Sequence, residues 1–231
     1  MSIRTPVRTA MFPLRLSWAI ANKAGLLADP PIGNSPYLHP DALEFWRKTI
    51  ARTDIYLEYG AGGSTIEASH SVKQIISVET DARYLDLVKQ KLASEGGPAQ
   101  FNPVRADIGL TSQWGQPVLD LPTASRRGKW RRYPAAPWVM LKQRSEVPDF
   151  IVVDGRFRAA SVLQSFLELP DGSKCQFLLD DFKSRASRYQ PCLTFADDIR
   201  SHGTAVSFVR HSRFDRDECE SMLEKMIADP L

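Results

Sequence analysis

The sequence predicts a doubly wound α/β fold, in which a mostly parallel sheet is covered by helices on both faces. Three observations favour it. Short runs of β-branched and aromatic residues alternate with segments of helical periodicity. The first run ends in a glycine-rich turn that leads directly into a helix with a capping-box pattern. Acidic residues follow several of the runs, at the edge where the carboxyl ends of parallel strands meet.

Six segments are expected to be strands, because each is short, rich in strand-forming residues and bounded by turn-forming ones. They are residues 55–59, 74–79, 100–105, 150–153, 175–179 and 205–209. The segments between them are long enough for right-handed βαβ crossovers. Helices are expected from a cap at Asp41, from the capping box Ser64-Thr65-Ile66-Glu67, and where apolar residues recur at helical spacing in residues 84–92, 159–167 and 219–227.

One interval, at about residues 108–147, interrupts this alternation and is expected to be an insertion between the third and fourth strands. It is rich in Gly, Pro, Arg and Trp and poor in helical periodicity. Its aromatic residues and prolines favour an ordered lid over a flexible tether. Residues 1–36 are expected to form a basic arm or helix, and residues 37–231 a single domain.

Composition narrows the class of protein. With 231 residues, 43% hydrophobic and 25% charged, the chain is an ordinary globular protein, which excludes a disordered chain, a collagen-like repeat and a membrane bundle. A net charge of +3 does not by itself indicate nucleic acid or membrane. The three cysteines are too widely spaced for a disulfide framework or a zinc site, so we expect a reducing compartment, the cytoplasm.

The N-terminus is basic, with Arg4, Arg8, Arg15 and Lys23 and no acid before residue 29. Pro13 and Arg15 interrupt what would be the apolar core of an export signal. An arm or helix is therefore expected, and an organelle transit peptide is the alternative.

The glycine-rich turn after the first strand indicates a ligand site. Gly60 and Gly62 let the backbone turn tightly and let a ligand lie against bare peptide, and the helix that follows offers unpaired N–H groups. A dinucleotide fingerprint wants a third small residue where this chain has Thr65, so the match to that fingerprint is imperfect.

Acidic residues end four of the expected strands. Glu79 lies at the distance from the turn where an acid accepts hydrogen bonds from ribose hydroxyls, and Asp107 lies within reach of an adenine amino group. Asp154 ends the fourth strand, and Asp180 and Asp181 end the fifth. Each alone is explained as a loop acid or a helix cap, but the set together indicates a nucleoside-containing ligand.

Glu58-Tyr59-Gly60-Ala61-Gly62 resembles the acid-x-Gly-x-Gly motif of class I S-adenosylmethionine-dependent methyltransferases, with Glu79 at that family's ribose-binding position and Asp107 at its adenine side. Asp107-Ile108-Gly109, Trp114-Gly115 and residues 153–158 more narrowly resemble uncharacterised bacterial methyltransferase-like proteins. The resemblance covers about residues 41–209 and implies a Rossmann-like methyltransferase sheet that binds S-adenosylmethionine.

The resemblance also implies contacts. Trp114 would form one wall of the cofactor pocket, with core packing as the alternative. The family ends in an antiparallel hairpin of two strands, of which one is evident here; the other is expected to continue through residues 208–214 or to be missing. The implied cofactor-binding residues are Glu58, Gly60, Ala61, Gly62, Gly63, Ser64, Glu79, Asp107, Ile108 and Trp114.

Asp154 and Asp181 are the acids expected nearest to the transferred methyl group. Methyl transfer is an in-line displacement, in which the protein orients the acceptor and helps to remove its proton. In some O-methyltransferases acids at matching positions hold a divalent cation, but no third ligand is identifiable and the Asp-Asn pair of those enzymes is Asp180-Asp181 here. We therefore expect no metal. Asp154 is a general base, a substrate anchor or the cap of the following helix.

Two groups of arginines favour an acidic acceptor. Arg156 and Arg158 follow the fourth strand, where they would clamp an anionic group or else pair with surface acids. Arg131 and Arg132 belong to the basic run 126–133, whose aromatic residues would stack on bases, or which is a solvated loop.

The sequence thus predicts an enzyme that moves a methyl group from S-adenosylmethionine to an oxygen or nitrogen of a small acceptor, with an anionic one favoured. Two alternatives stay open: a nucleoside-binding module without turnover, and an RNA methyltransferase that uses the basic lid. Thr65 and Glu58 argue against a dinucleotide oxidoreductase, and the absence of a G-x-S-x-G elbow argues against a hydrolase.

Overall fold

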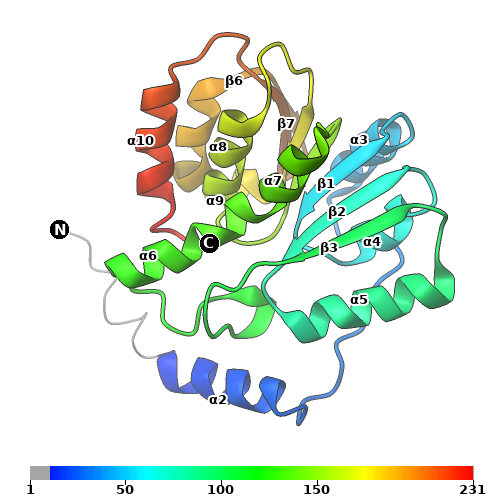
Figure 1. Cartoon of the computed structure of the whole chain (residues 1–231), viewed down its shortest axis with the longest axis vertical. Coiled ribbons are helices and arrows are strands. Elements are labelled where there is room, and N and C mark those ends of the chain that lie inside the picture. The colour runs from blue at the N-terminus through cyan, green and yellow to red at the C-terminus, as the bar shows by residue number, and fades with distance from the viewer. Residues whose placement is uncertain (1–10, 231) are drawn as a thin grey trace.

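The computed structural model describes residues 11–230. In that part of the chain seven strands form one sheet with the order β3-β2-β1-β4-β5-β7-β6 (Figure 1). The strands are β1 (Ile55–Tyr59), β2 (Gln74–Glu79), β3 (Gln100–Arg105), β4 (Phe150–Val153), β5 (Gln176–Leu179), β6 (Ala196–His202) and β7 (Ala205–Arg210). The first five are parallel, and β7 runs antiparallel to both of its neighbours. The strand order reverses between β1 and β4, which is where open α/β sheets bind ligands.

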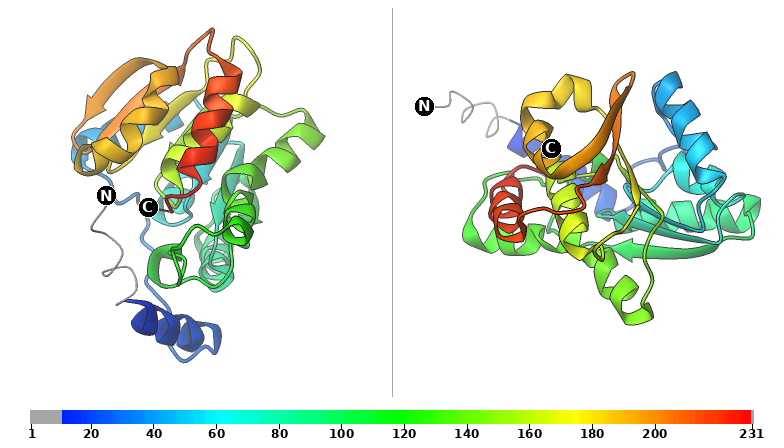
Figure 2. Two further views of the ribbon diagram at one scale, coloured as in Figure 1. Left: turned by 90° about the vertical axis from the view of Figure 1, so that its left-hand side faces the viewer. Right: turned by 90° about the horizontal axis from the view of Figure 1, so that it is seen from above.

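Helices connect the strands and lie on both faces of the sheet (Figure 2). They are α2 (Phe12–Lys23), α3 (Pro40–Ile50), α4 (Gly63–Ala68), α5 (Ala82–Glu95), α6 (Ala124–Trp130), α7 (Arg132–Arg144), α8 (Arg158–Glu168), α9 (Phe182–Tyr189) and α10 (Arg216–Met226), with 3-10 turns η1 (Gln113–Gly115) and η2 (Gln190–Phe195). This arrangement confirms the predicted doubly wound fold.

Alternation along the central strands explains the two layers. Tyr56 of β1 packs with Trp46 of α3 in one apolar cluster, whereas the next residue, Leu57, packs in the larger cluster on the opposite face, together with residues of α7 and α8. Successive side chains of a strand point to opposite faces, so a run that is apolar at every position needs cover on both.

The hairpin β6–β7 corrects the expectation for the last strand. The second strand of this hairpin pair is not a continuation through residues 208–214; it is β6, which precedes β7. Residues 197–201 of β6 are exposed, because β6 is the outer strand of the sheet. An edge strand with charged residues and a register shift has no apolar alternation to reveal it in the sequence.

The interval between β3 and β4 also differs from the expectation of little helical structure. It contains α6 and α7, and α7 packs on β2, β3 and α8 as the crossover helix of a βαβ unit. Pro134 and Pro137 lie in the first part of α7. Because proline is uncommon inside helices, the sequence did not predict a helix here. Tyr59 of β1 donates a hydrogen bond to the carbonyl of Pro134 (2.8 Å) and accepts one from the indole of Trp138 (3.0 Å).

The basic arm is partly described. Arg4 and Arg8 lie outside the described residues, but α2 forms a helix that packs against η1. The amide of Asn22 donates to Asp81 at the start of α5 (2.8 Å), and Arg83 donates to Asn22 in return (3.0 Å). Within residues 11–230, none of the helices combines the length and the apolar character that crossing a membrane requires.

The far end of α8 is closed by a residue of the hairpin. The guanidinium of Arg210 in β7 donates to the carbonyls of Phe166 and Leu169 (both 2.7 Å) and of Pro170 (2.8 Å). The last carbonyls of a helix have no partner inside the helix, so a buried cation there satisfies them and complements the helix dipole.

Candidate functional site

The turn after β1 is held between the ends of three strands. Gly60 donates its N–H to the carbonyl of Val78 in β2 (2.9 Å), and Gly155, after β4, donates to the carbonyl of Tyr59 (2.6 Å). Gly60 has a φ of +107°, and a Cβ there would lie 3.0 Å from the nitrogen of Gly155. Both the left-handed backbone and the close approach of the β4 loop therefore require glycine at Gly60.

The remaining residues of the turn face other parts of the chain. A Cβ at Gly62 would lie 3.2 Å from the Tyr84 hydroxyl of α5, and one at Gly63 would collide with the carbonyl of Ser35. Ser35 belongs to the segment that joins α2 to α3, so this segment closes over the start of α4. Ala61 is half-buried in the same turn.

Glu58 lies below the turn, with 1% of its surface exposed. Its carboxylate accepts four hydroxyl hydrogen bonds, from Tyr56 (3.1 Å), Ser64 (2.6 Å), Ser77 (2.5 Å) and Thr65. Burial raises the pKa of Glu58, while these four donors lower it. The Thr65 hydroxyl also accepts the N–H of Gly62 (2.9 Å), so Glu58 fixes the turn from beneath.

This geometry corrects the direct role expected for Glu58 and Ser64. Each side chain is already bonded to the other inside the protein, so neither carboxylate nor hydroxyl faces a ligand. They are positioning residues, which hold the glycine turn in its shape.

Glu79, at the end of β2, is different. One of its oxygens, Oε1, accepts the N–H groups of Thr80 (2.6 Å) and Asp81 (3.1 Å) and the hydroxyl of Thr80 (3.1 Å). None of residues 11–230 donates to the other oxygen, Oε2. Burial raises the pKa of Glu79, against the lowering by the two backbone N–H groups. The carboxylate is thus held by one oxygen and offers the other beside the glycine turn.

The loop after β3 folds over Glu79. A Cβ on Gly115 would lie 3.4 Å from Glu79 Oε1, so this loop packs closely against the carboxylate. Trp114 has a φ of +60° and is 85% exposed, which excludes the alternative that it packs in the core. Asp107 is exposed and accepts the N–H of Gly109 (3.0 Å), while Ile108 is buried.

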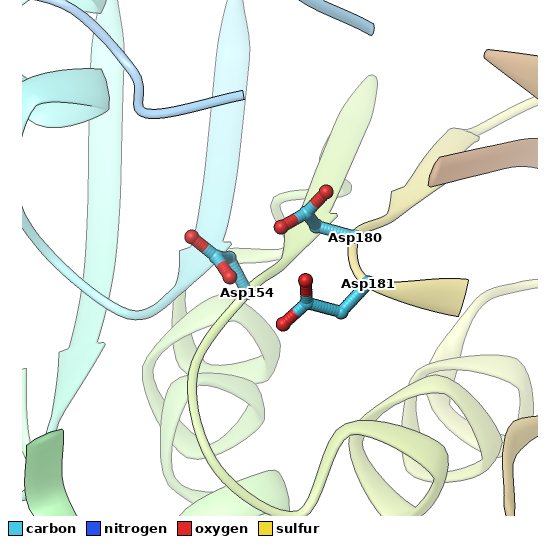
Figure 3. Close-up of side chains that lie close together, drawn as sticks. All are labelled: Asp154, Asp180 and Asp181. Carbon is cyan, nitrogen blue, oxygen red and sulfur yellow. The ribbon is translucent and has the colours of Figure 1, made fainter. Parts of the chain in front are cut away.

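Three carboxylates meet at the ends of β4 and β5. Asp154, Asp180 and Asp181 point toward one another, with one oxygen of each within 4.8 Å of the others (Figure 3). Arg158, only 3% exposed, lies among them: its guanidinium is 2.8 Å from Asp154, 3.3 Å from Asp181 and 3.9 Å from Asp180. It also donates to the carbonyls of Gly155 (3.1 Å) and Asp180 (2.8 Å).

Arg158 is therefore not the substrate clamp that the sequence suggested, because every face of its guanidinium is used by the protein. Carboxylate oxygens are the type of ligand that a hard divalent cation prefers. Such a cation would have to displace Arg158 from the same oxygens, so the residues present do not fit a metal centre. We call Asp154, Asp180, Asp181 and Arg158 the acid cluster.

Within the acid cluster, burial raises the pKa of Asp154 to about 7; Asp180 and Asp181 add to the shift and Arg158 opposes it. The Asp154 side chain keeps 44% of its surface exposed, so water screens part of this effect while leaving the carboxyl reachable. Burial also raises the pKa of Asp180. Asp181 is shared between Arg158 and Arg185 of α9, each at 3.3 Å, and holds these two arginines in place.

Arg156 lies two residues after Asp154 and has a different environment from Arg158. Its backbone N–H donates to the Tyr133 hydroxyl (3.3 Å), and its side-chain Nε is buried with no hydrogen-bond partner among the described residues. Its Cγ lies 3.7 Å from the position of a Cβ on Gly115.

The other two predicted substrate arginines lie at the junction of α6 and α7. Arg131 forms an ion pair with Glu224 of α10, and Arg132 is exposed. The aromatic residues beside them are not free to stack on bases, since Trp130 and Tyr133 are each 1% exposed and their ring centroids lie 5.6 and 5.9 Å from that of Phe157.

Two tyrosines lie at the site: Tyr84, which the sequence did not single out, and Tyr133, which was expected to stack on bases instead. Burial raises the pKa of Tyr84 to about 12, and the carboxylates of Glu79, Glu58 and Asp154 add to the shift. Burial and then Glu79 raise the pKa of Tyr133. Both hydroxyls therefore border the space between the ends of β1, β2 and β4. Tyr84 sits at an ordinary helical spacing of apolar residues, so no signal in the sequence separates it from a core position.

A second concave region lies away from the carboxyl ends of the parallel strands. It is a surface groove of about 1000 Å³ between α7, α8 and α10, and it is lined by charged residues of both signs, among them Lys142, Glu168, Arg216 and Glu220. It has no glycine turn and is lined mostly by helix residues away from the carboxyl ends of the parallel strands, so the strand ends are the better candidate for chemistry.

No family model and no curated protein matches the sequence. Solved structures do match the fold. A methyltransferase-like protein from Silicibacter pomeroyi DSS-3 is 26% identical, with a TM-score of 0.71 over 87% of this chain and 100% of that chain.

More distant matches include an O-methyltransferase from Bacillus cereus in complex with SAH, 12% identical with a TM-score of 0.47 over 90% of this chain and 93% of that one. The N-methyltransferase NodS from Bradyrhizobium japonicum WM9 is 14% identical, with a TM-score of 0.42 over 75% of this chain and 98% of that one. We rest the assignment of the fold on the Silicibacter protein and on the strand order.

Proposed function

Since this chain has the class I methyltransferase fold, we propose that it binds S-adenosylmethionine at the turn after β1 and transfers the methyl group to an oxygen or nitrogen of a small acceptor. The observation that carries the proposal is Glu79. Its Oε2 has no donor among residues 11–230, and Glu79 follows Val78, the residue that accepts the N–H of Gly60, as an acid that accepts from ribose hydroxyls requires.

The proposed cofactor contacts divide between direct and indirect ones. Glu79 binds the ribose, and the half-buried backbone of Gly60, Ala61 and Gly63 borders the amino-acid side of the cofactor. Residues 107–108 lie toward the adenine, with Trp114 in the loop above it. When bound, S-adenosylmethionine supplies the electrophilic methyl group.

Asp154 is the proposed general base. Its raised pKa, about 7, lets the carboxylate accept a proton near neutral pH, and its exposure lets an acceptor reach it. We assign Asp181 a positioning role, because both of its ion pairs go to arginines that border the site.

The test is a calorimetric titration of S-adenosylhomocysteine into the wild-type chain and into Glu79→Gln. We expect Glu79→Gln to lower the affinity about 10-fold or more, about 1.4 kcal/mol, because an amide cannot accept both ribose hydroxyls as a carboxylate does. Its melting temperature should stay unchanged, since the backbone N–H groups keep an acceptor oxygen. Asp86→Asn, an exposed acid of α5, is the matched control.

Equal affinity of Glu79→Gln and wild type, or tighter binding of a nicotinamide dinucleotide than of S-adenosylhomocysteine, would contradict this site. Transfer of a labelled methyl group to a panel of acceptors then separates an enzyme from a nucleoside-binding module. Binding with no product on any acceptor of the panel would favour the module.

A further inference from the structure

Arg156 is a half-buried cation, and its buried Nε has no hydrogen-bond acceptor among residues 11–230. Among residues 11–230 the other two arginines near these strand ends pair with acids. Arg158 pairs with the three aspartates of the acid cluster, and Arg185 pairs with Asp181. Arg156 forms no ion pair with any described acid, and its Nε is buried without an acceptor. A buried donor without a partner destabilises the folded protein, and more so when it is charged. Such a group in a folded protein calls for a ligand or another explanation.

None of the described groups around Arg156 forms an ion pair with it. Tyr133 of α7 and Tyr189 of α9 face it as neutral hydroxyls, and Arg158 and Arg185 repel it. Asp154, two residues earlier, is turned to Arg158 at 2.8 Å. Asp180 and Asp181 are likewise held by Arg158 and Arg185. The three aspartates at the ends of β4 and β5 are thus paired with other arginines. Glu79 also lies near Gly115, but it forms no ion pair with Arg156 among the described residues.

The position of Arg156 links it to the acceptor. Its backbone follows Asp154, the proposed base, by two residues. Its side-chain stem lies against Gly115, in the loop that covers Glu79 and hence the proposed ribose position. A ligand bonded to Arg156 would therefore lie between the proposed base and the cofactor, which is where a methyl acceptor must be.

We propose that Arg156 binds an oxyanion of the acceptor, a carboxylate or a phosphate, so that the enzyme selects small molecules carrying such a group near the methylated oxygen or nitrogen. This rests on the proposed function. A guanidinium pairs with carboxylate and phosphate oxygens through two parallel hydrogen bonds, and this geometry fixes the orientation of the acceptor as well as its charge.

The test uses four chains: wild type, Arg156→Gln, Arg156→Lys, and the control Arg200→Gln, which alters an exposed arginine of the edge strand β6. Benzoate and inorganic phosphate serve as anionic probes, and benzamide as the uncharged counterpart of benzoate. Binding is followed by ligand-observed NMR with and without S-adenosylhomocysteine. We expect wild type and Arg200→Gln to bind at least one anion, Arg156→Gln to bind it about 10-fold more weakly or worse, and Arg156→Lys to fall between them.

A second arm separates the acceptor from the cofactor's own carboxylate. S-adenosylhomocysteine carries the amino-acid part, whereas 5′-methylthioadenosine lacks it. We expect Arg156→Gln to bind both as tightly as wild type does. If Arg156→Gln loses affinity for S-adenosylhomocysteine alone, Arg156 binds the cofactor and the proposal is wrong.

Three further results bear on it. The proposal is overturned if neither anion binds wild type, if Arg156→Gln binds the anions as wild type does, or if benzamide binds as well as benzoate. If Arg156-dependent anion binding is found in a chain that does not bind S-adenosylhomocysteine, the anion site stands and the proposed function fails. A cooperative melt of Arg156→Gln shows that any loss of binding does not come from unfolding.

Discussion

At the carboxyl ends of the strands, carboxylates are held in different ways on the β1–β2 side and on the β4–β5 side. On the β1–β2 side, Glu58 is surrounded by neutral hydroxyls, and its network continues through Tyr56 to the indole of Trp46 (3.3 Å). On the β4–β5 side, the acid cluster is held by the charge of Arg158. The β1–β2 side thus stabilises its carboxylate with hydroxyl dipoles, and the β4–β5 side stabilises its carboxylates with a cation.

The difference separates a rigid part of the site from a titrating one. The four donors to Glu58 are neutral hydroxyls, so this network holds the turn without a countercharge. In the acid cluster, burial raises the pKa of Asp154 to about 7, so this carboxyl exchanges a proton with solvent near neutral pH. We infer that the β1–β2 side serves to bind, and that the β4–β5 side serves to move a proton.

Arg158→Met should give the largest effect, because it removes the cation from the acid cluster and leaves its shape nearly intact. Breaking a buried ion-pair cluster by removing one partner costs about 3–5 kcal/mol. The loss should be larger at pH 8 than at pH 5, since Asp154 becomes neutral as pH falls through about 7 and then needs no cation. Urea unfolding at the two pH values measures it; an equal loss at both would contradict the electrostatic account.

Asp154→Asn should lower the rate of methyl transfer by about 100-fold or more, which is the usual contribution of a general base. The wild-type rate should rise with pH through about 7, and the variant should lack this rise.

Stability supplies an independent readout for Asp154. Its pKa is higher in the folded chain than the value of about 3.9 in an unfolded one. Its stabilising contribution is therefore full below that value and is lost as pH rises through about 7. Asp154→Asn should gain stability relative to wild type over this range, and a constant difference in free energy of unfolding would refute the shift.

Glu58→Gln tests the neutral side of the rim. The amide offers one acceptor oxygen where the carboxylate offered two, so part of the hydroxyl network loses its acceptor. We expect a loss of about 2 kcal/mol in the free energy of unfolding. Unlike that of Arg158→Met, this loss should not grow between pH 5 and pH 8. A growing loss would mean that the two sides do not differ as described.

Trp114→Gly should have the smallest effect on stability and the opposite sign. Trp114 holds a left-handed backbone with its ring exposed, so glycine relieves strain and should raise the free energy of unfolding by about 0.5 kcal/mol. Affinity for S-adenosylhomocysteine should nevertheless fall, because the ring is lost from the loop over Glu79. Trp114→Ala keeps the strain and should show only the loss of affinity.

The sequence predicted the parts of the fold that leave local patterns. Apolar runs at β1, β2 and β4 predicted the central sheet, and the glycine turn lies at the edge where we propose that the ligand binds. The pattern failed at α7, where Pro134 and Pro137 disrupt the apparent periodicity of a helix that tertiary packing nevertheless stabilises. It failed at β6, where an exposed edge strand has no buried face.

The prediction of site residues was limited in the same way, because contacts between distant residues leave no local sequence pattern. The place of Glu79 was evident from its distance to the turn, but a sequence cannot tell that Glu58 bonds inward while Glu79 leaves an oxygen open. Arg156 and Arg158 look equivalent in the sequence. Only the structure separates them, because a two-residue step past the end of β4 turns Arg158 into the acid cluster and Arg156 toward the loop at Gly115.

The position of Arg210 bears on the order in which a nascent chain can fold. A chain that has left the ribosome only as far as β5 already contains Glu79, Asp154 and Arg158. The carbonyls at the end of α8 are then still without Arg210, which follows Leu179 by 31 residues. Because α8 begins at Arg158 and ends at the Arg210 cap, the acid cluster is fully supported only after the hairpin has been synthesised and has paired with β5. The residues that hydrogen-bond to Glu58 all precede β3, so this network is complete in the chain well before the hairpin is synthesised.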